Sequence, residues 1–166
     1  KTDNLGSTPE FKLEGTPLVA NGVLYATGGT RRSVVALDAG TGELLWVHSE
    51  REGARGQASP RRLSGRGLAY WTDGVDERVL YVTIGFQLVA LDAKTGMRVP
   101  DFGRDGIVDL KAAAVYGENR AIDLVTGELG WNAAPVVVRD VVIVGGTMVD
   151  GAMAKTHNNT KGLVQA

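Results

Sequence analysis

The chain has few side chains that could carry out chemistry alone. It contains no cysteine, which excludes disulfides, thiolate metal sites and cysteine catalysis. Its two histidines, His48 and His157, lie far apart in the sequence and have no clustered partners. Residues 28–30 form a Gly-Gly-Thr run without the lysine and the following helix of a phosphate-binding loop. The candidates that remain are carboxylate, guanidinium and amide side chains in the segments between strands.

The composition limits the classes of partner. The 166 residues carry a formal net charge of -1, which argues against a surface for nucleic acid or for an anionic membrane. No stretch approaches the ~20 consecutive apolar residues of a membrane span. Hydrophobic residues make up 43% of the chain, enough for one domain with a core, and the 23 glycines suit a turn-rich β protein. Because the first residue is Lys1 rather than Met, we expect a processed chain or a fragment.

Three stretches share one pattern, an apolar run that leads into an aspartate and a Thr-Gly turn. They are residues 34–46, 89–96 and 121–131. A pattern that recurs in this way predicts repeated β-hairpins. The copies are unequal, because the first and third end in Trp46 and Trp131 whereas the second has no tryptophan there. We expect both tryptophans to pack between repeats, and the third copy to form a hairpin too close to the second to be a further unit.

The sequence predicts an all-β fold, since no segment shows the 3.6-residue period of an amphipathic helix. Four short antiparallel strands per repeat are typical of a propeller blade. The predicted blades cover residues 12–48, 66–100 and 132–166, about two and a half four-stranded blades of a β-propeller that closes only with four or more. Residues 49–65 and 104–120 are expected to be irregular connections. We expect the remaining blades to come from sequence outside this chain.

Several motifs in order along the chain resemble one enzyme family. They are Thr16-Pro17-Leu18-Val19, Arg66-Gly67-Leu68-Ala69-Tyr70-Trp71, Pro100-Asp101-Phe102-Gly103 and Ala134-Pro135-Val136-Val137, with Ala-Leu-Asp-Ala turns between them. Together they are similar to the pyrroloquinoline quinone (PQQ)-dependent dehydrogenases, whose fold is an eight-bladed β-propeller with tryptophan-docking repeats. The resemblance covers nearly the whole chain and is nearer the glucose and sugar branch than the methanol branch. It implies the N-terminal part of a quinoprotein that oxidises a sugar or an alcohol.

The resemblance also implies which residues contact the cofactor. It places Glu14, Arg66, Asn132, Gly146 and Thr147 against PQQ. Arg66 is the first choice among them, because a guanidinium fork fixes a planar carboxylate through two parallel charge-assisted bonds. For the polar side chains, a solvated loop or turn position without a ligand is the alternative.

Asp150 is the implied metal ligand, since calcium takes oxygen ligands and a carboxylate balances its charge. A turn aspartate before Gly151 is the alternative. The catalytic aspartate base and an asparagine ligand of calcium are expected beyond Ala166, so no catalytic residue is assigned within the chain. In the chemistry that the resemblance implies, Ca2+ polarises the quinone while the base takes the proton of the substrate hydroxyl and hydride passes to the quinone.

Members of the family with adjacent cysteines carry them a few residues before the arginine, where this chain has Pro60 and Arg61. That difference argues against a specifically alcohol-oxidising member. The implied partners are a small-molecule sugar or alcohol, an electron acceptor such as ubiquinone or cytochrome c, and the remaining propeller blades. The implied location is the periplasm or the periplasmic side of the inner membrane.

A propeller that uses the same repeats as a protein-binding scaffold, without catalysis, is the alternative function. Such a scaffold would keep the Ala-Leu-Asp-Ala and Thr-Gly repeats but has no reason to keep Glu14 or the Arg-Gly-Leu-Ala-Tyr-Trp motif at Arg66. The functional interpretation therefore depends on the residues between the repeats.

Overall fold

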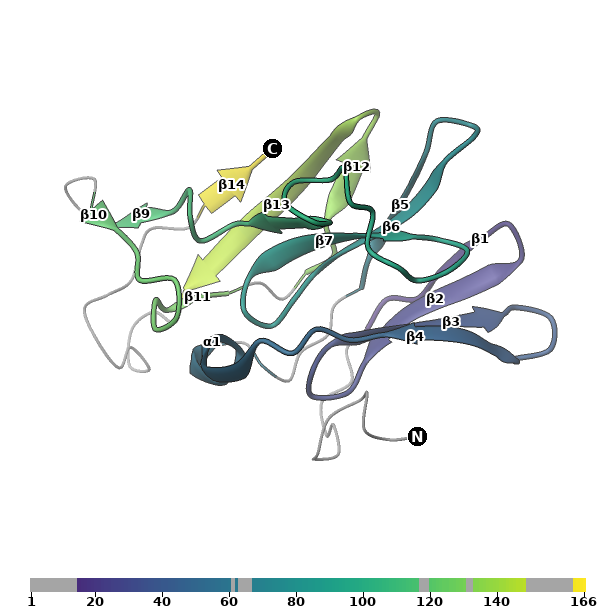
Figure 1. Cartoon of the computed structure of the whole chain (residues 1–166), viewed down its shortest axis with the longest axis horizontal. Helices are drawn as coiled ribbons and strands as arrows, with labels where there is room; N and C mark the ends of the chain where they lie inside the picture. The colour runs from purple at the N-terminus through teal and green to yellow at the C-terminus, as the bar shows by residue number, and fades with distance from the viewer. Residues whose placement is uncertain (1–14, 61, 63–66, 117–119, 131–132, 149–162) are drawn as a thin grey trace.

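Short antiparallel strands make up nearly all of the regular structure in this computed structural model, which confirms the all-β prediction (Figure 1). The structure describes residues 15–60, 62, 67–116, 120–130, 133–148 and 163–166. Within them lie three four-stranded sheets, one two-stranded sheet and one short helix. The elements are β1 (Leu18–Ala20), β2 (Val23–Gly28), β3 (Ser33–Asp38), β4 (Leu44–His48), α1 (Gly53–Ala58), β5 (Ala69–Thr72), β6 (Glu77–Val82), β7 (Gln87–Asp92), β8 (Ile107–Asp109), β9 (Val115–Tyr116), β10 (Arg120–Ala121), β11 (Leu129–Gly130), β12 (Val136–Val138), β13 (Val141–Met148) and β14 (Leu163–Gln165).

The first sheet shows how local sequence sets the strand register. Its strands β1 to β4 pair antiparallel in chain order. Asn21 and Gly22 connect β1 to β2 with positive φ values of 49° and 78°, as a two-residue hairpin turn with two left-handed residues requires. Ala20 consequently pairs with Val23. The hairpin predicted from the Asn-Gly pair is confirmed.

Each repeated Asp-x-x-Thr-Gly turn is held by its own aspartate. Asp38 Oδ1 accepts hydrogen bonds from the backbone N of Gly40 (3.0 Å), the backbone N of Thr41 (2.7 Å) and Thr41 Oγ1 (2.9 Å). The bonds from Thr41 lower the pKa of the Asp38 carboxyl. Asp92 and Asp123 accept the corresponding bonds in the second and third copies. One carboxylate oxygen thus closes each turn, which explains why Asp and Thr recur at a fixed spacing.

The second sheet, β5 to β8, is covered on both faces. In β6, Val79 and Tyr81 point into a hydrophobic core shared with the first sheet. Leu80 and Val82 point into a second core, shared with Val144 of the third sheet. Successive side chains of a strand face opposite sides, so a sheet with two neighbours needs a continuous apolar run rather than an alternating one. The second sheet is therefore the middle layer of a stack of three (Figure 1).

Trp46 of β4 joins the first sheet to the second. Its Nε1 donates to the backbone O of Ala93 at 3.1 Å, and the hydroxyl of Tyr25 donates to the same oxygen at 3.1 Å. The indole also covers Gly96, where a Cβ atom would lie 2.5 Å from the indole Cε3. The predicted packing of Trp46 between repeats is confirmed, whereas Trp131 lies outside the described residues.

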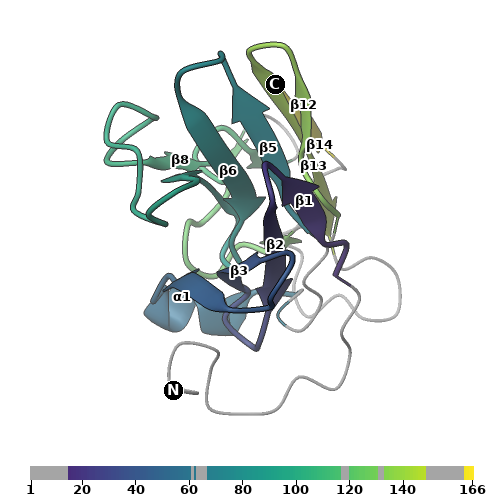
Figure 2. The same ribbon diagram turned by 90° about the vertical axis from the view of Figure 1, so that its right-hand side faces the viewer.

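In the third sheet, β13 pairs with three strands. Its partners are β12 through Ile143, β14 through Gly146 and β11 through Thr147. One edge strand of each sheet lies next to that of its neighbour, because β5 contacts both β1 and β12 (Figure 2). We call β1, β5 and β12 the first strands, although the short β11 precedes β12 in the chain. Blades of a propeller meet in the same way around their axis.

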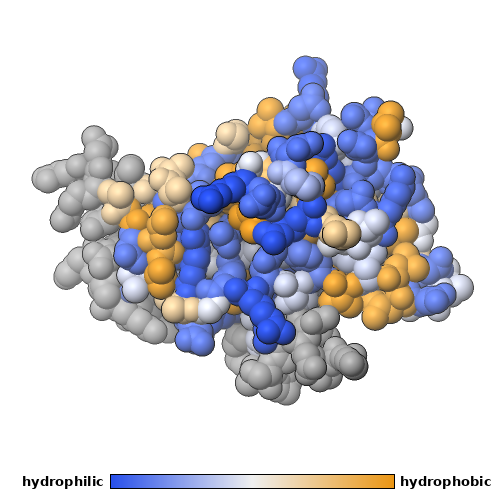
Figure 3. Space-filling view, in the orientation of Figure 1, coloured by the Kyte–Doolittle hydropathy of each residue, from blue (hydrophilic) through white to orange (hydrophobic). Residues whose placement is uncertain are grey.

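The outer faces of the stack are uncovered. In the first sheet, Val19, Leu44 and Leu45 are exposed, and Figure 3 shows apolar side chains over this part of the surface. In the third sheet, Val136 and Val138 are exposed. A sheet that is apolar on both faces requires another layer on each side, so both faces suit neighbouring blades.

Three local expectations are wrong. Residues 104–120 contain β8, which completes the second sheet beyond residue 100 by pairing with β7, and they contain β9. Residues 53–58 form the helix α1, which is too short to show a period in the sequence. Residues 121–131 do not form a hairpin, because β10 pairs with β9 and β11 pairs with β13. β8 and β11 thus pair with strands that are distant in the sequence rather than across a local turn.

Replacing Gly96 with alanine is expected to destabilise the intact protein more than replacing Gly42. The two glycines hold the same position in successive turns, and their φ values of 71° and 75° strain any alanine equally. Only at Gly96 does the new Cβ also collide with Trp46, because nothing lies within 4 Å of such an atom at Gly42. Chemical unfolding should show G96A losing about 1–3 kcal/mol more than G42A. Equal losses would show that Trp46 does not dock on Gly96.

Candidate functional site

The predicted cofactor contacts are close in the sequence to strand ends that lie together at one end of the sheets. β1, β5 and β12 begin at this end, and β2, β6 and β13 finish there because they run antiparallel to them. The helix α1 follows β4 at the same end, which we call the α1 end. Glu14, Arg66 and Asn132 precede the three first strands, while Gly146 and Thr147 lie near the end of β13.

Most of these predicted residues cannot be placed. Glu14, Arg66, Asn132 and Asp150 lie outside the described residues, and the structure gives only the backbone of Thr147. Gly146 is buried in β13, where it pairs with Leu163 of β14. The roles of these six residues therefore stay predictions.

The segments that lead into the first strands meet at Gly67. This residue has a φ of 116°, a conformation that favours glycine. A Cβ atom there would lie 2.9 Å from the backbone O of Thr16 and 3.4 Å from the Cβ of Ala134. Each of these three residues stands one or two positions after a predicted cofactor contact. The fold thus gathers the neighbours of three contacts that are far apart in the sequence.

Glu52, the residue before α1, fixes the helix to the turn between β6 and β7. Its Oε1 accepts from Thr83 Oγ1 at 2.6 Å, and its Oε2 accepts from the backbone N of Gly85 at 2.7 Å. Burial raises the pKa of the Glu52 carboxyl, and these two bonds oppose that shift. A side chain at Gly85 would collide with the carboxylate, so the glycine is required for this contact.

Arg55 of α1 ties the same turn to the end of β8. Its Nη1 and Nη2 donate to Oδ2 and Oδ1 of Asp109, both at 2.7 Å, and its Nε donates to the backbone O of Gly85 at 2.7 Å. Burial alone would raise the pKa of Asp109, but the hydrogen bonds and charge of Arg55 bring it below its ordinary value. A bidentate pair fixes orientation as well as distance. α1 is therefore held rigidly on the second sheet.

Arg32 links the first sheet to the second at the same end. It is buried with a positive φ of 52°, and its Nη1 donates to the backbone O of Val82 (3.1 Å) and of Thr83 (3.3 Å). A non-glycine residue with positive φ is strained, and the two bonds across the sheets offset that strain.

Lys111 is fully buried, and its Nζ has no hydrogen-bond partner among the described residues. Burial, and then the nearby charge of Arg55, lower the pKa of its amine to about 8. The carboxylates of Glu52, Asp109 and Asp123 act in the opposite direction. We define the charged cluster as Arg32, Glu52, Arg55, Asp109 and Lys111.

The sequence analysis did not identify the charged cluster. Its members come from separate connections between strands, and their types alone are ordinary for a surface. The one signal was the unusual length of the connection at residues 49–65, since long connections in compact domains are often functional.

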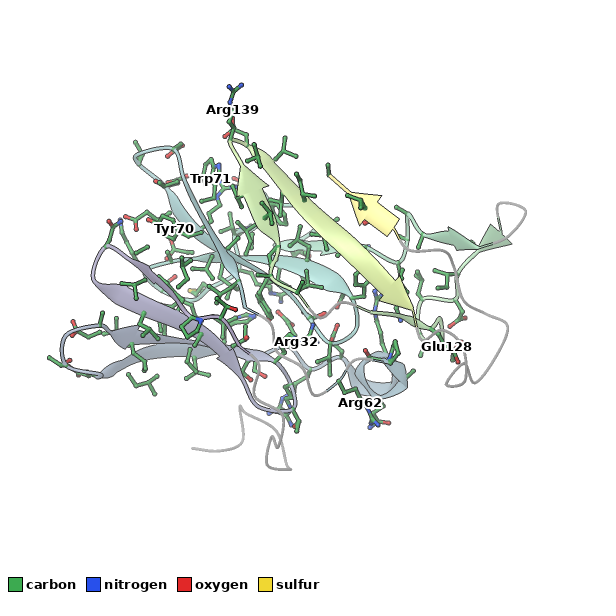
Figure 4. All side chains as sticks on the ribbon, turned by 180° about the vertical axis from the view of Figure 1, so that it is seen from behind. Arg32, Arg62, Tyr70, Trp71, Glu128 and Arg139 are labelled. Carbon is green, nitrogen blue, oxygen red and sulfur yellow. The ribbon has the colours of Figure 1, made fainter. Side chains whose placement is uncertain are left out.

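A metal site made only of described residues is absent. No three histidine, cysteine, aspartate or glutamate side chains among them lie close enough together to hold an ion. One buried carboxylate does have an unfilled acceptor, because Glu128 Oε2 has no hydrogen-bond partner in the described part of the chain. Figure 4 shows Glu128 beside the end of β13. Within the same residues, no helix is long and apolar enough to cross a membrane.

Stacked four-stranded sheets whose first strands meet, joined by a tryptophan of one repeat docked on the turn of the next, define a partial β-propeller with tryptophan-docking repeats. Over residues 1–166 the chain matches the PQQ family described as the glucose/ethanol/alcohol dehydrogenase β-propeller domain, and it belongs to that family.

Three relatives show the range of the family. The dehydrogenase subunit of a quinone alcohol dehydrogenase from Gluconobacter oxydans is 43% identical over 89 residues, which are 52% of this chain and 11% of the relative. The large subunit of a glycerol dehydrogenase from the same organism is 29% identical over 153 residues, 88% of this chain and 19% of the relative. Quinohemoprotein alcohol dehydrogenase ADH IIB from Pseudomonas putida is 31% identical over 140 residues, 72% of this chain and 20% of the relative.

Solved structures have the same fold. Quinohemoprotein alcohol dehydrogenase ADHIIG from Pseudomonas putida HK5 superposes with a TM-score of 0.64 at 29% identity, covering 86% of this chain and 18% of that one. The quinohemoprotein alcohol dehydrogenase from Comamonas testosteroni gives 0.63 at 26% identity, covering 87% and 18%. The chain thus spans no more than about a fifth of these relatives.

Lys111→Met is expected to stabilise the intact protein at neutral pH. The pKa of Lys111 is about 8 in the folded chain and near 10.5 when unfolded, so between these values the unfolded chain binds more protons and stability rises with pH. At pH 7 the buried ammonium therefore costs stability, and K111M should raise the melting temperature by about 2–4 °C. The advantage should shrink above pH 8 and vanish above pH 10.5.

Lys94→Met is the control, because the side chain of Lys94 is 69% exposed. It should change the melting temperature little and equally at every pH. If K111M is less stable than the native protein at pH 7, the Lys111 ammonium has a stabilising partner and its interpretation as a buried, uncompensated charge is wrong.

Proposed function

We propose that the protein containing this chain uses PQQ to oxidise a hydroxyl group of a small alcohol or polyol, and that the α1 end holds part of the cofactor site. The observation that carries the proposal is the meeting of Thr16, Gly67 and Ala134. Their contact draws together the neighbours of Glu14, Arg66 and Asn132. Membership of the PQQ family supplies the cofactor.

The α1 end fits a flat, anionic cofactor in two respects. Close contact of three chain segments occurs at a glycine, whose missing side chain lets Thr16 and Ala134 approach the point where the three first strands begin. Arg66 directly precedes that glycine, and its guanidinium would pair with a carboxylate of PQQ in two parallel bonds. Glu14 would accept a hydrogen bond from the cofactor, and Asn132 would supply an amide contact. PQQ, when bound, supplies the quinone that accepts the hydride.

A calcium ion at the same end is part of the proposal. Thr147 and Met148, the last two residues of β13, pair with β11, and Asp150 follows them closely in the sequence. Oxygen ligands of this kind suit Ca2+, and a carboxylate would offset part of its charge. The catalytic base and further ligands would come from sequence beyond Ala166.

The substrate class follows from the relatives. Relatives that match half or more of the chain are named alcohol and glycerol dehydrogenases, which favours a small alcohol or polyol. The segment Pro100-Asp101-Phe102-Gly103 resembles the sugar branch, so an aldose is the second substrate to test. Electrons would leave to a quinone or cytochrome acceptor, and we propose a periplasmic location.

Activity of the intact protein tests the proposal. Protein purified without cofactor is mixed with PQQ and Ca2+ and assayed for reduction of an artificial electron-accepting dye with ethanol, glycerol or glucose. We expect dye reduction that requires PQQ and is faster with ethanol or glycerol than with glucose. Activity with glucose alone would make the protein a sugar dehydrogenase. A folded protein that neither binds PQQ nor reduces the dye would overturn the proposed function and favour the scaffold.

Arg66→Lys and Arg66→Met are expected to weaken PQQ binding about tenfold or more, because both lose a bidentate charge-assisted pair. Arg62→Met is the matched control, since Arg62 is an exposed arginine of the same connection. Titration of PQQ against tryptophan fluorescence measures the affinities, and the R62M value should equal that of the native protein. An R66M protein with native affinity would remove Arg66 from the cofactor site.

A further inference from the structure

One position of the repeated turn differs sharply between its copies. The residue after each Thr-Gly pair is Glu43 in the first copy, Met97 in the second and Glu128 in the third. Glu43 is exposed, and Met97 is 70% exposed. Glu128 is only 7% exposed, although Asp123 accepts the same three hydrogen bonds within its turn. Gly127 lacks the positive φ of Gly42 and Gly96, so the third turn differs from the other two in the conformation that follows the threonine as well as in its location.

The third turn lies at the α1 end of the sheets, whereas the first two turns lie at the opposite end. Asp38 and Asp92 pair with the starts of β2 and β6, opposite the α1 end. Asp123 instead lies close enough to Lys111 to affect its pKa, and the strand after it, β11, pairs with the C-terminal end of β13. A motif that elsewhere only closes a hairpin is used here to place a carboxylate at the α1 end.

The neighbours of Glu128 hold it in place. Leu129 is fully buried, and both Leu129 and Ile122 belong to the core between the second and third sheets. Gly127 leaves no room for a side chain, because a Cβ atom would collide with the backbone O of Asp123 and with Ile122. The backbone on both sides of Glu128 is thus anchored in the core.

The Glu128 carboxylate has no compensation from the described residues. Its Oε2 is buried without a hydrogen-bond partner, and no ion pair involves it. Leaving a charged oxygen in this state is costly, and such groups in folded proteins usually mark a missing ion or water. A cation satisfies both the charge and the acceptor. The chain has no cysteine, and His48, the histidine within the described part, contacts Glu50 rather than Glu128, so a hard cation that takes oxygen ligands fits better than zinc.

We propose that Glu128 is a ligand of a divalent, oxygen-coordinated cation of the Ca2+ class, bound at the α1 end beside the C-terminal end of β13. The position follows from the pairing of Gly130 with Thr147, which keeps Glu128 next to the last residues of that strand (Figure 4). Calcium takes six to eight oxygens, so backbone carbonyls, waters and a second carboxylate complete the site. Asp150, the metal ligand expected from the sequence, comes shortly after the same strand end. The assignment depends on the proposed function only in that the cation would share an end of the propeller with PQQ.

Binding of Ca2+ alone tests the proposal without the cofactor. The intact protein is stripped with chelator, and Ca2+ is titrated by calorimetry into native, Glu128→Gln and Glu43→Gln proteins. Glu43→Gln is the control, because it makes the same change after a Thr-Gly pair at a position where the carboxylate is exposed. We expect E128Q to lose one class of Ca2+ site or to bind it about tenfold or more weakly, and E43Q to match the native protein.

Thermal unfolding supplies a second readout that a packing role would not reproduce. In chelator, E128Q should melt higher than the native protein, because the amide removes an uncompensated buried charge. With Ca2+ the native protein should gain stability, and E128Q should gain less, because a ligand that binds only the folded state stabilises it. An E128Q protein that melts lower in chelator and binds Ca2+ normally would overturn the proposal.

A PQQ titration in chelator distinguishes a bound cation from PQQ itself as the partner of the Glu128 carboxylate. If E128Q weakens PQQ binding without Ca2+ but leaves the Ca2+ titration unchanged, the carboxylate contacts the quinone and the cation assignment is wrong. If the native protein binds Ca2+ through Glu128 but never binds PQQ, the proposed function fails while this inference stands. If native PQQ binding is intact and the Ca2+ titrations of all three proteins agree, only this inference fails.

Discussion

Burial of the second sheet on both faces is the constraint on which the rest of the structure depends. Alternate residues of β6 enter two separate cores, so neither face is stable without a neighbouring sheet. The first sheet covers one face and adds the indole of Trp46, which fits only because Gly96 has no side chain. The third sheet covers the other face through Val144 and Leu129. Face-to-face stacking in turn forces the first strand of each sheet against the next.

The same stacking creates the α1 end. When β1, β5 and β12 lie side by side, the segments before them converge, and Gly67 is the point of contact. The charged cluster then fixes the periphery, because Glu52 and Arg55 attach α1 to the turn after β6 and to Asp109. The described residues at this end thus combine a close contact at a glycine with polar side chains that hold α1 in place. That combination suits a site in which a bound group, not the protein, supplies the reactive atoms.

The repeats and hairpins could be predicted because their causes are local. An Asn-Gly pair sets its own turn, and Asp38 satisfies the backbone within three residues of itself. β8 and α1 were missed, since a strand of three residues and a helix of six have no period to detect, and both depend on partners distant in sequence. Glu128 could not be recognised for a related reason. Its motif shares Asp-x-x-Thr-Gly-Glu with the copy that is exposed at Glu43, and the burial of the third copy depends on strands that are distant in the sequence.

The dock of Trp46 on Gly96 gives the row of blades a direction. Trp46 belongs to the earlier repeat and Gly96 to the later one. Each repeat therefore contributes one side of the contact with the repeat before it and one side of the contact with the repeat after it. The second repeat has the glycine, Gly96, but no tryptophan at the position that corresponds to Trp46, and it packs against the third sheet through aliphatic residues instead. A blade that is duplicated or moved to another position would therefore carry contact residues that do not match those of its new neighbour. Gene shuffling within such a propeller should preserve pairs of adjacent blades more readily than single ones.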